Sequence, residues 1–269
     1  MVFDGKIVMS INSVLTRFAQ QNLVLSYKDD ERNKIKTSIY HLKDILWQKL
    51  SSQIVEIIDF GSYTRNTILP RKHDPNSDID LMIVFNNDNL LKPETYRRKL
   101  LSVVTTAYPN SISKKDFPAV KLELNHIKFD LVPAYTQIPF LGGKRYYIPA
   151  KDGEWMQTTP NDINQLLSDR NQECGNNIIR NAIRLCKHWN AFANYPFESY
   201  LMEKEILSLR YFNANDTYSR FVYSLNDIAG DIPSVRQAID YIYKYNNRGN
   251  EEKQLFWLKK LLPGLCEII

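Results

Sequence analysis

The spacing of hydrophobic side chains along the chain is first helical, then strand-like, then helical again. Residues 10–26 and 29–50 carry apolar side chains at helical intervals among charged residues, and the same spacing returns at 93–107. Helical spacing also fills the second half of the chain, at 160–170, 175–193, 198–209, 216–228, 233–245 and 251–262. Helices are therefore expected on both sides of a central region of strands.

The strand-like runs lie between residues 54 and 135. IVEIIDF (54–60) stops abruptly at Gly61-Ser62. DIDLMIVF (78–85) is apolar on both faces after its first residues, which predicts a central strand of a sheet. The segments 120–124 and 127–135 alternate apolar and polar residues and predict an antiparallel hairpin.

These patterns predict an α+β protein with two parts. A mixed sheet with flanking helices is expected over residues 1–153, with the sheet ending near residue 150, and a helical lobe over 154–269. Because ligands commonly bind in the crevice between two such parts, we expect the functional site there.

Composition narrows the class of protein. Of the 269 residues, 43% are hydrophobic and 24% are charged, values typical of soluble globular proteins, which excludes disordered and fibrous classes. The net charge of +5 permits anionic ligands such as nucleotides without indicating a protein that coats a duplex. Cys174, Cys186 and Cys266 are widely separated, which is typical of reduced thiols and argues against a disulfide framework or a zinc knuckle.

No segment indicates a membrane or an export signal. The longest apolar runs, such as LMIVF (81–85), fall far short of the ~18 residues that a membrane span needs. The opening MVFDGKIVMSINS has an early acidic residue and no long apolar core, unlike a signal peptide. We therefore expect a cytoplasmic protein with no membrane partner.

Three aspartates carry the candidate chemistry. Asp78 and Asp80 are two residues apart on a predicted strand and share one face of the sheet, while Asp130 lies on a later strand between Phe129 and Leu131. If the two strands pair, the three carboxylates converge and remain ionised only with bound cations, for which Mg²⁺ or Mn²⁺ is suited. A lone strand aspartate is usually solvated. Two acids that begin a buried run are costly unless they have partners, which favours a metal site.

Gly61-Ser62 follows a predicted strand directly. A glycine lets the backbone approach a phosphate closely, and the amides of the turn with the serine hydroxyl form an anion-binding nest. Most Gly-Ser pairs are ordinary turns, so the value of this one comes from its place ahead of the acidic strand. Arg65 is equally consistent with a triphosphate contact and with a surface residue, and Thr67 is expected to support the loop.

A second cationic element lies on the predicted helix at 175–193. Arg180, Arg184 and Lys187 are spaced to share one face, opposite an apolar face that includes Leu185 and Trp189. The simpler interpretation is a solvated charged face. A lobe that faces a metal–triphosphate site needs cations for phosphates, which favours Lys187 as a phosphate ligand.

Other motifs are absent or uninformative. The histidines, His41, His73, His126 and His188, have no metal-ligand spacing and are expected on the surface or in loops. No GxSxG, P-loop or HExxH pattern occurs, which removes the common hydrolase and Walker-type interpretations.

The segment GSYTRNTILPRKHDPNSDIDLMIVF resembles the GS…DxD signature of the polymerase-β nucleotidyltransferase superfamily. With the N-terminal helix and RLCKHWN…PFESYLMEKEIL, the chain over about residues 10–210 is similar to the bacterial cGAS/DncV-like nucleotidyltransferases of the SMODS type (CD-NTases), relatives of cGAS and oligoadenylate synthetase. The resemblance implies a polymerase-β-like sheet followed by a helical lobe, with the active site in the cleft between them.

The resemblance also implies catalytic roles. Asp78 and Asp80 would hold two Mg²⁺ ions, with Mn²⁺ as an alternative metal. Asp130 would complete the second metal site and help to activate the acceptor hydroxyl.

Further residues would bind the donor nucleotide. Gly61 and Ser62 would hold its phosphates, Lys187 would reach them from the helical lobe, and Ser199 occupies a position where relatives often place a phosphate-contacting serine.

The chain departs from the family pattern in three respects. Fifteen residues separate Ser62 from Asp78, more than the compact superfamily spacing, although long loops here are familiar among CD-NTases. Asn66 replaces the glycine of an RGT-type loop, and asparagine also tolerates unusual backbone angles. The zinc insert of cGAS is absent, so zinc-dependent DNA binding is not expected.

The implied function is synthesis of a cyclic di- or trinucleotide, or a short oligonucleotide, from ATP, GTP or other NTPs. Pyrophosphate would be released, and a downstream effector of anti-phage (CBASS) signalling would recognise the product; we expect a monomer. One alternative is a nucleotidyltransferase that tails RNA or NMPylates protein, but RNA tailing predicts a basic and aromatic track, whereas the cations here are scattered among acids. A non-catalytic NTP sensor predicts loss of a carboxylate, and all three are present. Spacing alone leaves base selectivity, linkage, ring size and activation open.

Overall fold

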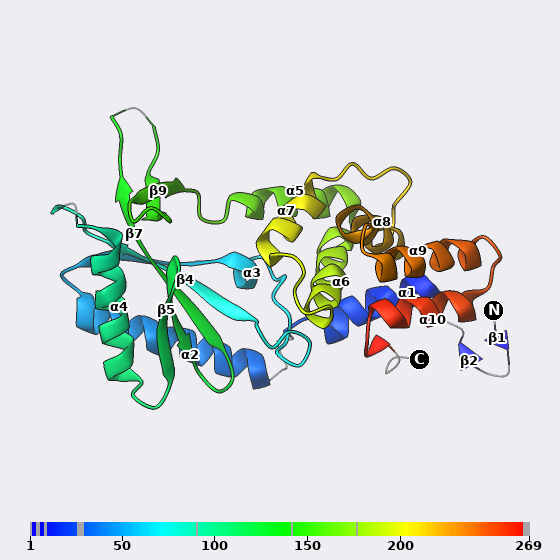
Figure 1. The fold of residues 1–269 in the computed structure, drawn as a ribbon, viewed down its shortest axis with the longest axis horizontal. Helices are drawn as coiled ribbons and strands as arrows, with labels where there is room; N and C mark the ends of the chain where they lie inside the picture. Colours follow the sequence, from blue (N-terminus) through cyan, green and yellow to red (C-terminus); the bar gives the residue numbers. More distant parts are fainter. Residues whose placement is uncertain are drawn as a thin grey trace. The chain divides into compact units, whose positions relative to one another are not determined.

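The computed structural model describes residues 2–3, 6–7, 10–25, 30–89, 91–140, 142–175 and 177–265. The chain forms two compact units, a sheet unit of residues 25–71 and 76–162, and a helical unit of residues 1–24, 72–75 and 163–269 (Figure 1). The described residues before 25 thus belong with the helices, and the last change of unit falls after residue 162. The sequence predicted one boundary at 153 with the N-terminal helices in the sheet domain, and that domain assignment stays a prediction.

The sheet unit is built on a seven-stranded mixed sheet. Five strands follow the order β3-β4-β7-β6-β5, and two more extend β7 through β8 to β9. Their bounds are β3 Ile54–Phe60, β4 Asp78–Phe85, β5 Ile112–Asp116, β6 Ala119–Glu123, β7 Lys128–Gln137, β8 Arg145–Pro149 and β9 Trp155–Thr158. β4 pairs with β7 in parallel and with β3 antiparallel, so β4 is an interior strand, as its apolar pattern predicted.

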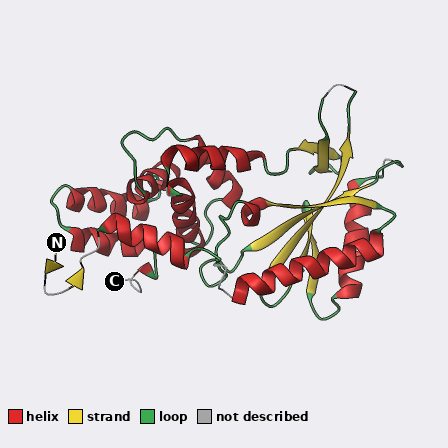
Figure 2. Ribbon diagram, turned by 180° about the vertical axis from the view of Figure 1, so that it is seen from behind, coloured by secondary structure: helices red, strands yellow, loops and turns green. Residues whose placement is uncertain are grey.

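Two helices cover one face of this sheet. α2 (Asp30–Leu50) and α4 (Pro93–Ala107) lie along it in Figures 1 and 2. Alternate residues of β4, from Ile79 to Phe85, pack with them in one hydrophobic core, which includes Leu42 and Leu100. The other face of β4 is apolar beyond its first residues, where Met82 and Val84 pack in a separate small cluster.

The predicted strands at 54–60 and 78–85 are confirmed, as is the hairpin of β6 and β7. The sequence missed β5, whose residues ISKKD are mostly exposed and show no apolar alternation, as suits a lysine-protected edge strand. The expectation that the sheet ends near residue 150 was wrong, because β9 continues it to Thr158. Pairing with β8, rather than an apolar pattern, makes this last strand.

The helical unit contains α1 (Ile11–Arg17), a π-helical turn η1 (Phe18–Asn22) and a two-stranded ladder of β1 (Val2–Phe3) with β2 (Lys6–Ile7). Its remaining helices are α5 Asp162–Cys174, α6 Ile178–Phe192, α7 Ser199–Ser208, α8 Thr217–Ala229, α9 Pro233–Asn246 and α10 Glu251–Leu261. α6 packs against η1, α7 and α8, and it is buried around most of its circumference. Tertiary packing therefore surrounds the helix that the sequence predicted to have a charged face.

The described ranges also bear on membrane spans and on disulfides. None of their helices is both long enough and apolar enough to cross a lipid bilayer. Cys174 and Cys186 are free thiols, and Cys266 lies outside the described residues.

Burial of the β7 side chains against α2 and α4 predicts a matched pair of stability effects. Phe129→Ala removes a fully buried ring and should lower the free energy of unfolding by about 3–5 kcal/mol. Phe140→Ala, at a fully exposed position of the same unit, should change it by less than about 0.5 kcal/mol. Urea denaturation of both variants measures the difference, and equal costs would contradict the assignment of the core.

Candidate active site

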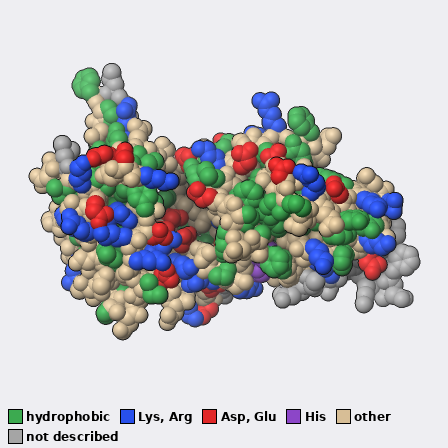
Figure 3. All heavy atoms as spheres, in the orientation of Figure 1, with side chains coloured by type: hydrophobic (Ala, Val, Ile, Leu, Met, Phe, Trp, Pro, Cys, Tyr) green, Lys and Arg blue, Asp and Glu red, His purple; other side chains and the backbone are tan. Residues whose placement is uncertain are grey.

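The strand register of the sheet brings two of the predicted aspartates together. Asp80 on β4 is the direct partner of Asp130 on the parallel strand β7, so both side chains lie on the same face of the sheet. Asp78 begins β4 two residues earlier and shares that face. Acidic side chains bordered by Lys and Arg gather over β4 and α3 in Figure 3. The predicted pairing of the two acidic strands is thus confirmed.

Gly61 begins the short helix α3 (Gly61–Thr64) directly after β3 and lies against Asp80. Its φ of +76° is in the left-handed region, and a Cβ added there would come 1.8 Å from Oδ2 of Asp80. Only glycine lets the backbone run this close to the carboxylate. The sequence predicted a backbone approach to phosphate at Gly61, and the structure shows a close approach to the acidic strand.

The turn after Gly61 is held from within the sheet unit. The carbonyl of Ser62 accepts hydrogen bonds from the amides of Thr67 and Ile68 at 3.0 and 3.1 Å, and the buried Thr67 hydroxyl lies 3.4 Å away. Thr67 therefore supports the loop, as predicted. Asn66 has a φ of +55°, the kind of unusual backbone angle that asparagine tolerates. Arg65 is buried, which excludes the surface interpretation of that side chain.

Asp130 is in an electrostatically unfavourable setting. Burial, with a contribution from Asp78, raises the pKa of its carboxyl to about 7, although Lys121 opposes the shift from 3.8 Å. The buried Oδ1 of Asp130 has no hydrogen-bond partner among the described residues. A carboxylate in this state is stabilised by a bound cation.

The residues present fit a divalent metal ion. They supply carboxylate oxygens, the buried Oδ1 of Asp130 without a partner among the described residues, and a glycine whose missing Cβ would otherwise collide with the Asp80 carboxylate. In the described part of the chain, however, no three His, Cys, Asp or Glu side chains are spaced to hold an ion. Metal binding by Asp78, Asp80 and Asp130 together stays a prediction.

The other two predicted site residues belong to the helical unit. Lys187 on α6 is 5% exposed, and its Nζ lies 3.1 Å from Oε1 of Glu203, which is 1% exposed. Ser199 is the first residue of α7 and is half-buried. The phosphate-binding roles of both residues stay predictions.

The alternative of a solvated charged face on α6 was wrong. Lys187 and Arg184 are both buried, and Arg184 donates a hydrogen bond to the carbonyl of Ala19 at 3.4 Å. Burial, together with the charge of Arg180, lowers the pKa of the Arg184 guanidinium to about 10. Buried cations require partners, and Arg184 and Lys187 each have one within the helical unit.

Sequence reasoning missed Lys121 and Asn161. Lys121 is the direct partner of Asp130 on β6, and the hairpin alternation around Val120 and Leu122 would have indicated its face. Asn161 accepts a hydrogen bond from Thr64 at 3.1 Å and donates one to the carbonyl of Asp59, which braces the Gly61 turn. No sequence pattern signals the contact of Asn161 with Asp59, since 102 residues separate the partners.

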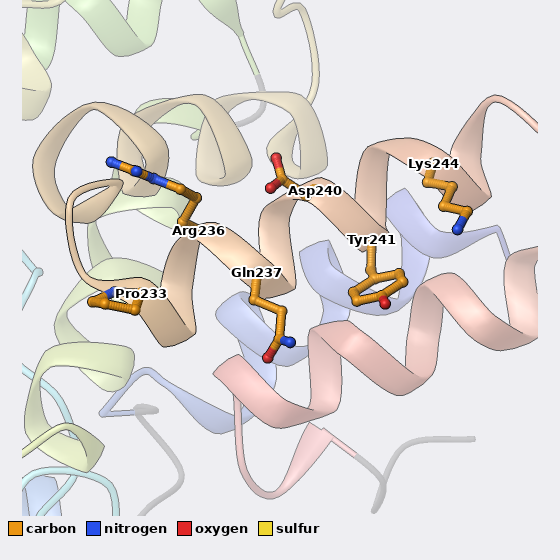
Figure 4. A pocket seen from close by; sticks show the side chains of 6 residues that line it. All are labelled: Pro233, Arg236, Gln237, Asp240, Tyr241 and Lys244. Carbon is orange, nitrogen blue, oxygen red and sulfur yellow. The ribbon is translucent and has the colours of Figure 1, made fainter.

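A surface pocket elsewhere in the helical unit contains none of these residues. One face of α9 lines it, with Gln237 and Tyr241 pointing towards α10 and Arg236 and Asp240 pointing away (Figure 4). It lacks the clustered carboxylates that a metal-dependent site requires.

The fold recurs in solved structures. This chain is similar to E. coli MS115-1 CdnC, solved with ATP, with a TM-score of 0.69 at 16% identity. The match covers 96% of this chain and 98% of that chain. The Vibrio cholerae cyclic AMP-GMP synthase DncV, solved with the linear intermediate 5′ pppA(3′,5′)pG, matches with a TM-score of 0.58 at 12% identity over 96% of this chain and 82% of that one. The class of protein is therefore a CD-NTase-like α+β fold, as predicted.

The sequence itself identifies the family. Residues 9–171 match the model of the Second Messenger Oligonucleotide or Dinucleotide Synthetase (SMODS) domain, and the chain belongs to that family. Membership implies dependence on divalent metal ions in general. A CBASS oligonucleotide cyclase, CdnC of E. coli strain KTE188, is 23% identical over 209 residues, 72% of this chain. The chain spans only 64% of the length of that relative.

The close approach at Gly61 predicts a specific defect in Gly61→Ala. The wild-type protein should show a rise in Tm with Mg²⁺, and in Gly61→Ala the new Cβ should displace the Asp80 carboxylate and abolish that rise. Gly153→Ala is the matched control, because Gly153 also has positive φ (+86°) but open space around it. Both variants should lose about 1 kcal/mol of stability to backbone strain, and a normal cation response in Gly61→Ala would contradict the geometry.

The raised pKa of Asp130 predicts that this carboxylate opposes folding when no metal is bound. The folded pKa of about 7 exceeds the ordinary value of 3.8, so the cost is complete above pH 7 and disappears towards pH 4. Asp130→Asn should therefore raise Tm by several degrees at pH 8 in EDTA and progressively less as the pH falls.

The control for Asp130→Asn is Asp116→Asn. A hydrogen bond from Lys121 holds the pKa of Asp116 below its usual value, so removing that charge should not raise Tm. Thermal unfolding from pH 4 to 8 measures both variants. A lower Tm for Asp130→Asn in EDTA at pH 8 would contradict the assigned electrostatics.

Proposed function

We propose that the protein is a metal-dependent nucleotidyltransferase that joins NTPs into a cyclic di- or trinucleotide, or a short oligonucleotide, second messenger. The observation that carries the proposal is the register of Asp80 with Asp130, beside a glycine that approaches the Asp80 carboxylate. Membership of the SMODS family and the 23% identical oligonucleotide cyclase support the same activity and a role in CBASS signalling.

The reaction is an in-line displacement at phosphorus. The oxygen of an acceptor 2′- or 3′-hydroxyl bonds to the α-phosphorus of an NTP, and the bond from that phosphorus to the oxygen bridging the β-phosphate breaks. Pyrophosphate leaves with the electron pair, and the hydroxyl proton passes through Asp130 to solvent. A second transfer within the linear product closes a ring.

Each predicted residue has a part in this reaction. Asp78, Asp80 and Asp130 would hold two Mg²⁺ ions, which when bound stabilise the charge on the attacking and leaving oxygens. The partnerless Oδ1 of Asp130 is available to accept the hydrogen bond of the acceptor hydroxyl. Gly61 and Ser62 hold the donor phosphates through the braced turn, with Lys187 and Ser199 as further phosphate contacts.

The proposed substrates are ATP, GTP or related NTPs. Related structures support this choice, since CdnC of E. coli MS115-1 was solved with ATP and CdnG of Bradyrhizobium diazoefficiens with GTP. We propose a monomer whose product is recognised by a separate effector.

The decisive experiment incubates the protein with four NTPs and Mg²⁺ and identifies phosphatase-resistant products by mass spectrometry. Asp78→Asn should reduce product formation by at least about 100-fold, because the metal-binding face is disrupted. Asp44→Asn, at an exposed position of α2 in the same unit, should leave it unchanged.

Other outcomes separate the alternatives. Pyrophosphate release without a small nucleotide product would indicate a macromolecular acceptor, RNA or protein. Near-normal product from Asp78→Asn would overturn the assigned site.

A further inference from the structure

The long connection between Ser62 and Asp78 does not stay within the sheet unit. Its residues 72–75 pack as part of the helical unit. There the buried Asp74 accepts a hydrogen bond from the hydroxyl of Tyr195 at 2.7 Å. A segment that leads directly into the acidic strand is thus held by another unit of the protein.

Packing of aromatic rings also holds residues 72–75 in the helical unit. The His73 ring lies edge-on to His188 of α6, with centroids 5.1 Å apart, and Phe18 of η1 contacts both rings. Burial lowers the pKa of His73 to about 4 and also lowers that of His188, so both rings pack in the neutral form at pH 7. The expectation that all four histidines lie on the surface or in loops was wrong for His188, which is buried in a helix.

The loop that supplies Tyr195 is specifically shaped. Tyr195 has a φ of +57°, in the left-handed region that a tyrosine rarely adopts, and its amide donates to the carbonyl of Asn190 at 2.8 Å. The buried Asn190 side chain fixes the far side of this loop, since it donates to the carbonyl of Phe197 and accepts from the amide of the same residue. The backbone that carries the phenol is therefore held in a defined conformation.

Both residues of the Asp74–Tyr195 hydrogen bond lie close to predicted site residues along the chain. Asp74 precedes Asp78 by four residues, and Tyr195 precedes Ser199 by four. His188 follows Lys187 directly. Segment 72–75 is therefore separated from the start of β4 at Asp78 by only two residues, Asn76 and Ser77.

We propose that Asp74 and Tyr195 are positioning residues, which together with the His73–His188 packing tether the start of the acidic strand to the helical unit that carries Lys187 and Ser199. The tether rests on the proposed function, and none of its residues needs to touch the nucleotide. It acts by limiting the freedom of the chain that enters β4 at Asp78, because in-line transfer requires a positioned acidic residue there.

The test uses variants that change as few atoms as the chain allows. Tyr195→Phe removes only the hydroxyl, and Asp74→Ala removes the acceptor. Asp74→Asn retains an oxygen that the phenol can donate to, so it serves as the conservative rescue. Tyr243→Phe, at an exposed position of α9, is the matched control for loss of a phenol.

Two measurements are made on the full chain: hydrogen–deuterium exchange of peptides covering residues 72–77, and steady-state kinetics with NTPs. Tyr195→Phe and Asp74→Ala should each raise exchange in these peptides and lower kcat by about tenfold, with KM for NTP within about twofold of the wild type. Asp74→Asn and Tyr243→Phe should behave as the wild type in both measurements. The double variant Asp74→Ala/Tyr195→Phe should be no worse than the poorer single variant.

Three results would overturn the tether. Unchanged exchange in Tyr195→Phe would show that the hydrogen bond does not hold the segment, and raised exchange with an unchanged kcat would show that the contact only stabilises the fold. Both leave the proposed function intact. If the wild-type protein makes no product while the two variants raise exchange as expected, the proposed function is overturned, and the positioning role with it.

Discussion

The parallel pairing of β4 with β7 is the constraint on which the rest of the sheet unit depends. Side chains alternate between the faces of a sheet, so a slip of one residue would turn Ile79 and Leu81 out of the core and the aspartates into it. Burial of the apolar side chains against α2 and α4 therefore fixes the register. The same register places Asp80 opposite Asp130, so the packing of one face determines the chemistry of the other.

The register concentrates the negative charge of Asp78, Asp80 and Asp130 on one partly buried part of the sheet face. The protein offsets some of it with Lys121, yet the pKa of Asp130 remains raised and its Oδ1 remains without a partner among the described residues. Folding against such a cost is characteristic of functional sites, where a ligand that binds later supplies the missing interaction. Gly61 contributes to the same site, because a side chain at its position would collide with the Asp80 carboxylate.

In the helical unit, by contrast, the buried charges have partners within the protein. Its central helix α6 buries two cations, and each has a protein acceptor, Glu203 for Lys187 and a backbone carbonyl for Arg184. Lys187 is therefore held by Glu203 within the folded unit, at the energetic cost of two buried charges. Residues 72–75, which precede the acidic strand along the chain, are held within this unit by the hydrogen bond of Asp74 with Tyr195.

The sequence by itself determined the strands that carry the aspartates, most of the helices, the GS…DxD motif and the family. Period-two and helical spacing are local properties, and the spacing of Gly61, Asp78 and Asp80 is a property of one short segment. Only the tertiary structure decided which charges are buried, because burial depends on neighbours far along the chain. A charged stripe on α6 looks solvated until η1, α7 and α8 surround it, and residues 72–75 look like an ordinary loop until they meet His188 and Tyr195, more than 110 residues later.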